Sequence, residues 1–280
     1  MFRLLQIEWI KLKNSRASKV LIVVYFLLLL SISLVSMIQF NIGDIHIAIA
    51  DQGIFNFPFI WHFNTYFAGM FKIFLLLVVV SMTANEYANR TIKQNLIDGM
   101  SKKEFILSKF YMVLLLAFIS TVFVFIVSLI QGLLYSDYQE FLSITTDLVF
   151  LLAYFIKLVA FFSFGLFLGI LIKRSAFAIG ALGVWYIIEQ VIYSLLRWKF
   201  FKDTNIHDKV MQFFPLHAMS NVIIQPFTRF NKVKSLAKST NTKELLGIDY
   251  HIHAEQLLIL VIWTFLFVYL SYWLLRKRDL

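Results

Sequence analysis

Three ionisable residues lie inside long apolar stretches of this sequence: Lys72, Lys157 and Glu189. An ionised side chain is costly within a bilayer, so such residues are expected to pair with one another or to mark a substrate path. At about 1.5 Å per helical residue, all three are predicted to lie roughly 10–15 Å below the outer membrane boundary. We expect Lys157 to pair with Glu189, because consecutive antiparallel helices are usually neighbours.

Two interpretations of these charges stay open. In the first, the three residues line a path for a substrate. In the second, Lys157 and Glu189 form a packing pair that fixes helix register, while Lys72 extends its ammonium group outward. An assay of transport and of membrane abundance in Lys157→Ala and Glu189→Gln variants distinguishes the two.

Small residues in the same stretches predict close helix packing. Gly165-x-x-x-Gly169 is a spacing that lets a neighbouring helix approach closely, and Ala176-x-x-x-Gly180 is another. Gly180 is predicted to lie opposite Glu189 on its helix. We therefore expect contact on both sides of that helix, with a second copy of the chain as one candidate on the Gly180 side.

The motifs of soluble enzymes are missing from the sequence. It contains no GxxxxGK[ST] loop for ATP, and no HExxH, CxxC or GxSxG motif. Among the histidines, His251-x-His253 has a spacing that resembles a metal-ligand pair, but two histidines do not make a site. We therefore predict no catalytic, cofactor-binding or metal-binding residue in this chain.

The composition excludes a soluble domain. Of the 280 residues, 60% are hydrophobic and 15% are charged, whereas soluble domains have about 45–50% and about 25%. The chain is too hydrophobic to be disordered, and it has no cysteine for a disulfide scaffold. Its net charge of +10 does not indicate a nucleic-acid partner, because 39 of the 42 charged residues (26 basic and 16 acidic) lie outside six apolar runs.

These runs predict an all-α integral membrane protein with six transmembrane helices, which form a single transmembrane domain over residues 1–280. Each run has the ~20 largely apolar residues that a membrane span needs. The six predicted spans are Val20–Phe40, His62–Thr83, Phe110–Leu134, Leu148–Ile172, Ser175–Leu196 and Gln256–Leu275.

Lys and Arg residues in the connections predict the orientation. Residues 1–19, 84–109 and the tail after residue 275 are basic, whereas residues 41–61 and 135–147 contain no Lys or Arg. This alternation places both termini in the cytoplasm. The connection at residues 197–255 has nine Lys/Arg residues and breaks the pattern, but it is placed outside because moving it would require losing or gaining a span. Within it, Phe213–Phe227 is predicted to be a re-entrant hydrophobic hairpin and Phe230–Thr242 a polar loop.

Two basic segments are predicted to fold at the inner face. Residues 1–19 are expected to form an interfacial helix with Phe2, Leu5, Trp9 and Leu12 on one side, although a simple basic anchor also fits. Ala84–Ile97 is predicted to be a short helix, followed by a turn at Asp98-Gly99. Ser101 and Glu104 fit a capping box that starts a second helix.

Together these features resemble the membrane subunit of an ATP-binding-cassette (ABC) transporter, in particular the bacterial type-2 exporter permeases. The arm MFRLLQIEWIKLKNSR is similar to the opening of that family, with Glu8 and Lys11–Lys13 in the usual places. The stretch NEYANRTIKQNLIDGMSKKEFILSK is the most specific match. The matching positions are Glu86, Asn89-Arg90-Thr91, Lys93, Asp98-Gly99, Ser101–Lys103 and Lys109. Gly99-Met100-Ser101 stands where many members have proline or arginine.

The resemblance implies a function and partners. The Glu86–Leu96 helix would be a coupling helix seated in a cytoplasmic ATPase, which would bind ATP and Mg²⁺ in place of this chain. Two permeases, as a homodimer or pseudo-dimer, and two ATPases would form the unit in the lipid of the bacterial inner membrane, and the external hairpin would close the outer gate. The residues implied in coupling are Glu86, Arg90, Thr91, Lys93, Leu96, Gly99 and Ser101.

Two other functions remain as alternatives. The chain is alternatively a structural or assembly component of a cell-envelope machine, in which nothing crosses the membrane. It is otherwise a secondary transporter driven by ions, with Lys72, Lys157 and Glu189 as the relay, although no inverted repeat is evident. The sequence does not identify the substrate.

Overall fold

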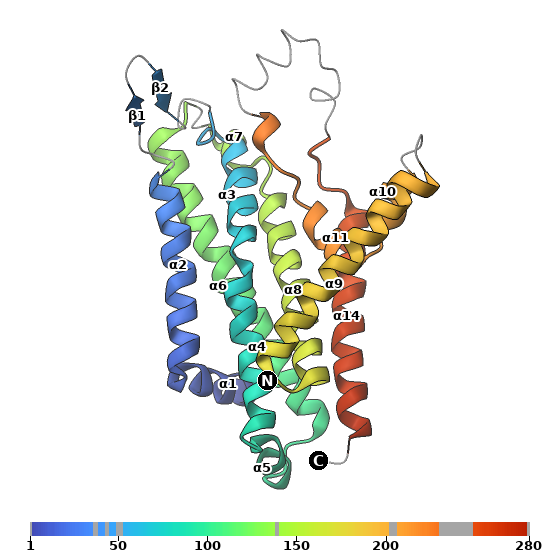
Figure 1. Ribbon diagram of the computed structural model, residues 1–280. Helices are drawn as coiled ribbons and strands as arrows, with labels where there is room; N and C mark the ends of the chain where they lie inside the picture. The colour runs from blue at the N-terminus through green and yellow to red at the C-terminus, as the bar shows by residue number, and fades with distance from the viewer. Residues whose placement is uncertain are drawn as a thin grey trace.

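The chain folds into an upright bundle of helices with one helix lying across its base. The computed structural model describes residues 2–35, 39–42, 45–48, 53–137, 140–201, 206–229 and 249–278. We call the end that holds α1, α5 and both termini the lower end, and the opposite end the upper end (Figure 1). The helices are α1 (Phe2–Asn14), α2 (Arg16–Val35), α3 (Phe59–Met70), α4 (Lys72–Ala88), α5 (Thr91–Ile97), α6 (Lys102–Tyr135), α7 (Phe141–Thr145), α8 (Val149–Ile172), α9 (Ser175–Leu195), η2 (Leu196–Phe200), α10 (Ile206–Met211), α11 (Pro215–Asn221), η3 (Phe227–Arg229) and α14 (Ala254–Lys277).

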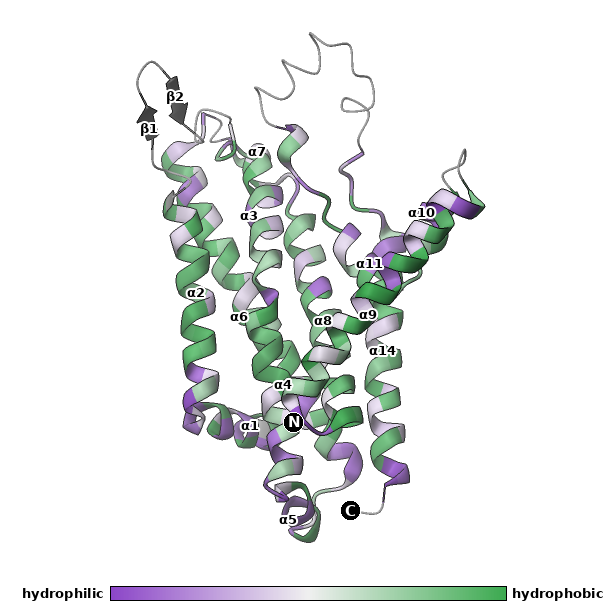
Figure 2. Ribbon diagram, in the orientation of Figure 1, coloured by the Kyte–Doolittle hydropathy of each residue, from purple (hydrophilic) through white to green (hydrophobic). Residues whose placement is uncertain are grey.

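Long apolar helices dominate the described part of the chain. Five of them, the longest being α6, are long and apolar enough to cross a membrane, and α3 with α4 would make a sixth. Figure 2 shows that the hydrophobic residues run along the upright helices and that hydrophilic residues gather on α1, at the lower end and on α10 at the upper end. This agrees with the expected helical membrane protein. A short antiparallel hairpin of β1 (Gln39–Ile42) and β2 (Ile45–Ala48), which the sequence did not predict, lies at the upper end.

The second predicted span is not one straight helix. His62–Thr83 was expected to be continuous, but α3 and α4 meet at Phe71 with a bend of 45°. Gly69 lies in the last turn of α3, and glycine weakens a helix at such a position. The Phe71 amide then donates to Ala68 O at 3.2 Å in a tightened final turn. The first predicted span also ends early, because Phe40 belongs to β1 and α2 ends at Val35.

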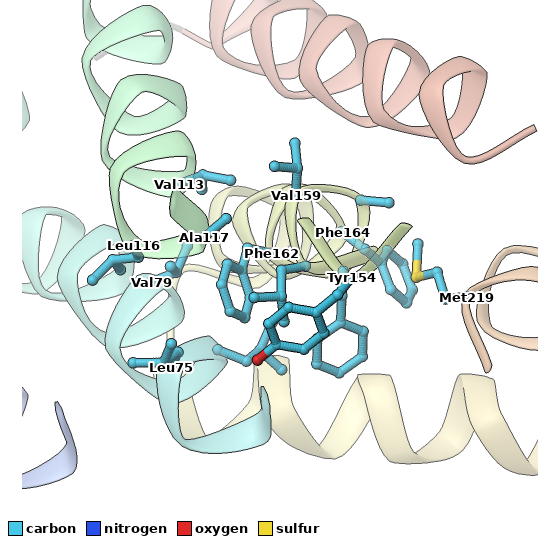
Figure 3. Close-up of a cluster of buried hydrophobic side chains, with 14 of the residues drawn as sticks. Leu75, Val79, Val113, Leu116, Ala117, Tyr154, Val159, Phe162, Phe164 and Met219 are labelled. Carbon is cyan, nitrogen blue, oxygen red and sulfur yellow. The ribbon is translucent and has the colours of Figure 1, made fainter. Parts of the chain in front are cut away.

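Helix α8 forms the centre of the bundle. It contacts α3, α4, α6, α9, α11 and α14, and most of its side chains are buried. Figure 3 shows α8 side chains such as Tyr154, Phe162 and Phe164 surrounded by residues of α4, α6 and α11. The sequence of α8 is apolar on every side, which is typical of a helix with neighbours all round.

Two glycines of α8 bring it close to α4. A Cβ atom added at Gly165 would lie 2.3 Å from Leu76 Cδ1, and one at Gly169 would lie 3.4 Å from Thr83 Cβ. The close approach expected of these glycines therefore occurs within one chain. Gly180 differs, because among the described residues nothing lies within 4 Å of a Cβ added there.

The predicted hydrophobic hairpin at the upper end contains a short helix. Within Phe213–Phe227, α11 packs against α8, α9 and α14, and its residues Met219 and Leu216 are buried. The neighbouring Ile223 is buried as well. The predicted polar loop Phe230–Thr242 lies outside the described residues.

We predict that Gly165→Leu destabilises the purified chain, whereas Gly180→Leu does not. Overpacking a filled core costs about 1–3 kcal/mol, and Leu76 opposite Gly165 is fully buried. Thermal unfolding in detergent measures both variants. An equal melting temperature for Gly165→Leu and the unmodified chain would contradict the α4–α8 contact.

Candidate functional site

Four charged side chains from three helices meet at the lower end. They are Glu8 and Lys11 of α1, Glu86 of α4 and Lys109 of α6, and we call them the charge cluster. Lys109 Nζ donates to Glu8 at 2.7 Å and also donates to Glu86. Lys11 Nζ donates to Glu86 at 2.9 Å and to Glu8 at 3.4 Å. Two carboxylates and two ammonium groups therefore neutralise one another.

Three of the four residues of the charge cluster are buried, which makes their pairing necessary, and Lys11 is half-buried. Glu8 is 1% exposed, Lys109 3% and Glu86 5%. Buried charges without partners are strongly destabilising, whereas a pair with good geometry compensates the loss of hydration. Burial opposes ionisation of Glu8, but Lys109 and Lys11 outweigh it and hold the pKa of Glu8 below its usual value. Burial likewise opposes the charge on Lys11, but Glu8 and Glu86 raise its pKa.

One side of α1 packs against the helix bundle. The side facing the bundle carries Leu4, Glu8 and Leu12, at helical spacing, and all three are buried. Trp9, which was expected on the same side as Leu12, is 45% exposed. Glu8 decides this orientation, because its carboxylate turns toward Lys109. The signal in the sequence was that Glu8 is the single acidic residue among the basic residues of the arm.

The predicted helix Ala84–Ile97 is wrong as one element. Helix α4 continues to Ala88, the chain reverses at Arg90 in a left-handed conformation (φ 56°), and α5 begins at Thr91. The reason is the buried position of Glu86, which keeps the end of α4 inside the bundle. Thr91 Oγ1 donates to Glu86 O and Asn95 Nδ2 donates to the Glu86 carboxylate, each at 3.4 Å, so α5 folds back onto α4.

The turn between α5 and α6 matches the prediction. Gly99 has φ 94°, and its amide donates to Leu96 O at 3.2 Å, while the Met100 amide donates to Asn95 O at 3.0 Å. This pair of bonds is the Schellman motif, in which glycine takes the left-handed position after a helix. The capping box at the start of α6 is confirmed: Ser101 Oγ accepts from the Glu104 amide, and the Glu104 carboxylate accepts from the Ser101 amide.

The residues implied in coupling divide into exposed and buried ones. Glu86 is buried, and Thr91 and Leu96 are half-buried, so they hold α5 in place. Exposed side chains project from α5 and its flanking turns, and Ile97 is 84% exposed. We call this region the α5 surface; it consists of Arg90, Lys93, Gln94, Ile97, Asp98 and Gly99, and the exposed Ser101 follows it.

A polar pocket lies beside the charge cluster. It has a volume of about 390 Å³ and opens between α1 and the lower part of α4. Lys11 and Glu86 line it together with Asn14, Asn89 and Thr91. The lower end therefore presents both a projecting α5 surface and a recess with polar walls.

The predicted pair of Lys157 with Glu189 is wrong. Glu189, which is 1% exposed, accepts hydrogen bonds from the amides of Leu216 and His217 at 3.1 and 2.8 Å, and from Trp185 Nε1 at 2.7 Å. Those amides are the free donors in the first turn of α11, where Pro215 has no N–H. The Glu189 carboxylate therefore caps α11.

Lys72 and Lys157 instead lie near each other where α3 and α4 meet. Lys72 Nζ lies over the Phe161 ring of α8, 4.3 Å from its centroid. Lys157 is 4% exposed, and its Nζ would lie 3.6 Å from a Cβ added at Gly69 in α3. The outward extension of Lys72 that one interpretation expected is not seen, because its ammonium group rests on an aromatic ring within the bundle.

We predict that Lys109→Met lowers the unfolding free energy by about 3–5 kcal/mol, because it leaves two buried carboxylates with Lys11 alone. Adding Glu86→Gln to Lys109→Met should cost less than the sum of the two single changes. Thermal unfolding of the four proteins in detergent measures this coupling. Lys13→Met, at an exposed position on the same arm, serves as the control, and a loss in Lys109→Met no larger than the control's would contradict the prediction.

Comparison with known proteins identifies the chain's family. No curated protein matches the chain. A family model described as "ABC-2 family transporter protein" matches residues 60–273, which include α3 to α11 and nearly all of α14. The match supports a membrane component of a transporter rather than an enzyme. The chain belongs to the ABC-2 family of transporter proteins and is a multi-pass membrane protein of the ABC permease kind.

Proposed function

We propose that this chain is the membrane-spanning permease subunit of an ATP-driven exporter in a bacterial inner membrane. A separate ATPase subunit would bind ATP and Mg²⁺ and hydrolyse the nucleotide. The observation that carries this proposal is the α5 surface, which projects from the lower end and is joined to α1, α4 and α6 through the charge cluster. Family membership supports the transport role.

The lower end would face the cytoplasm, with both termini on that side. The basic residues of segments 1–19 and 84–109 and of the tail after residue 275 gather there, as expected of the cytoplasmic side, and the long connection at residues 197–255 is the exception. Helix α1 would then lie along the inner leaflet, where its basic residues meet anionic lipid headgroups. An apolar groove of about 400 Å³ between α1 and α6, lined by Leu5, Trp9, Leu115 and Ile119, would accept lipid acyl chains.

The α5 surface would be the contact with the ATPase. Ile97 is an apolar side chain left in solvent at its tip, and Arg90 and Lys93 add positive charge beside it. Such a combination suits a groove with an apolar floor and acidic rim. Glu86, which is buried, would act as a positioning residue rather than a contact.

Force applied to α5 would reach the membrane helices through Glu86. Its main-chain oxygen and carboxylate hold α5, and the same carboxylate binds Lys11 of α1 and Lys109 of α6. Movement of α5 would therefore shift α1, α4 and α6 together. Because α3 and α4 meet at a bend, the lower half of that span has a point about which it can tilt.

We predict that Ile97→Asp and Lys93→Glu abolish co-purification of the ATPase without unfolding the permease. Both positions are exposed, so the substitutions should change the melting temperature by little. The measurement uses tagged permease co-expressed with a candidate Walker-motif ATPase from the same organism. Lys19→Glu, exposed at the same end but on α2, is the matched control.

If the ATPase still co-purifies with both variants, the α5 surface is not the docking surface. ATP hydrolysis in proteoliposomes then separates two functions of the complex. Hydrolysis stimulated by a transported compound supports export, whereas hydrolysis that no candidate compound stimulates supports an assembly role in the cell envelope.

We also propose that a second permease packs on the Gly180 side of α9. Most of α9 is exposed in the single chain, including Phe177, Val184 and Ile187. Gly180 lies open, as a helix-contact glycine of a separate subunit would.

Gly180→Leu is predicted to remove the dimer seen by chemical crosslinking in membranes while leaving the chain folded. Gly165→Leu is unsuitable here because it disturbs the interior of one subunit. A Gly180→Leu variant that remains fully dimeric would exclude this side of α9 as the contact.

A further inference from the structure

Within the part of the chain that the structure describes, Lys72 and Lys157 have no acidic partner. The sequence has no Asp or Glu from residue 52 to 85, from 105 to 136, or from 148 to 188, so α3, α8 and all of α4 above Glu86 offer no carboxylate. Glu189, the acidic residue of the neighbouring helix α9, is occupied by three donors at α11 and α9. Among the residues that the structure describes, neither Lys72 nor Lys157 has a carboxylate within ion-pair distance.

The geometry places both ammonium groups in one region. Lys157 and Phe161 are four residues apart and share a side of α8. Gly69 and Lys72 are three residues apart and flank the bend between α3 and α4. Lys157 of α8 places its Nζ against Gly69, and Lys72 of α4 places its Nζ against Phe161 of α8. Both ammonium groups therefore lie beside the bend between α3 and α4.

The backbone does not compensate these charges. The carbonyl end of α3 near Lys157 carries about half a negative charge, and the amide end of α4 at Lys72 carries about half a positive charge. These opposite partial charges cancel each other, so the charges of Lys72 and Lys157 remain uncompensated by the backbone. In a broken membrane helix, the amide end of the second half is a recurrent binding place for anionic groups.

We propose that this junction binds the anionic headgroup, a carboxylate or phosphate, of an amphiphilic molecule that the transporter moves. Transport of this molecule rests on the proposed function, whereas its binding to the junction does not. Lys72 and Lys157 supply the two charges. The apolar side chains around α8 accept the hydrocarbon part, and Phe161 lies beside the headgroup site.

Lys157 is the buried element of the site and Lys72 the accessible one. Lys157 is 4% exposed within a single chain, so a carboxylate of a second permease could not reach it. Lys72 is half-buried, so a ligand reaches the junction from its side. A small anionic molecule entering beside Lys72 would reach both ammonium groups.

Binding is tested on the full-length permease in a neutral maltoside detergent, without an ATPase. The probes are oleate, 1-oleoyl-lysophosphatidate, uncharged monoolein and inorganic phosphate, with the shift of the thermal unfolding midpoint as the readout. Oleate and the lysophosphatidate are expected to raise the midpoint, and monoolein, with the same chain, is not. Stabilisation by inorganic phosphate alone would support the anion site but assign it to a free anion instead of an amphiphile.

Variants connect the binding to the two lysines. Lys72→Met and Lys157→Met should each weaken oleate binding at least ten-fold, Lys157→Arg should retain it within about three-fold, and Lys103→Met, at an exposed lower-end lysine, should leave it unchanged. If Lys157→Met does not fold, the Lys72→Met variant alone tests the site. It is expected to fold, because it removes a charge from a half-buried position.

Equal stabilisation by monoolein and oleate would overturn the proposal, as would full oleate binding by Lys72→Met. Either result leaves the docking of an ATPase at the α5 surface standing, because that is measured by co-purification with Ile97→Asp.

Discussion

The cost of a charge away from water organises this molecule. Glu8, Lys11, Glu86 and Lys109 satisfy one another, and that mutual neutralisation determines how α1 lies, where α4 ends and why α5 folds back. A single removal leaves an unpaired charge, so the four residues behave as a unit rather than as independent contacts. The helices at the lower end are consequently joined by electrostatics as well as by apolar packing, whereas those around α8 are joined mainly by apolar packing.

The sequence predicted the elements better than their contacts. Long apolar runs identify membrane helices because a span must have a minimum length, and Gly99 and Ser101 mark a turn and a helix start through local backbone chemistry. These signals depend only on nearby residues, and the structure has the apolar helices, the turn at Gly99 and the helix start at Ser101. The break at Phe71 was not predicted, because Gly69 alone does not distinguish a bent helix from a straight one.

The partners of the charged residues could not be predicted from spacing along the chain. Glu189 was expected to pair with Lys157 because their helices are consecutive, yet the free amides of α11 take its carboxylate. Lys109 was recognised only by resemblance, and its contact with Glu8 spans a hundred residues of sequence. Such pairings depend on which helix faces turn together, and one acidic residue in a basic arm was the sole indication.

The capping of α11 by Glu189 has a mechanical consequence. Because a side chain of α9 holds the first turn of α11, α9 cannot tilt away from the bundle and leave α11 behind. A rotation of α9 would therefore displace α11, whose capped amide of Leu216 lies 27 residues after Glu189 in the chain. An outward movement of α9 would thus move α11 in the same step, because the hydrogen bonds of Glu189 join the two helices.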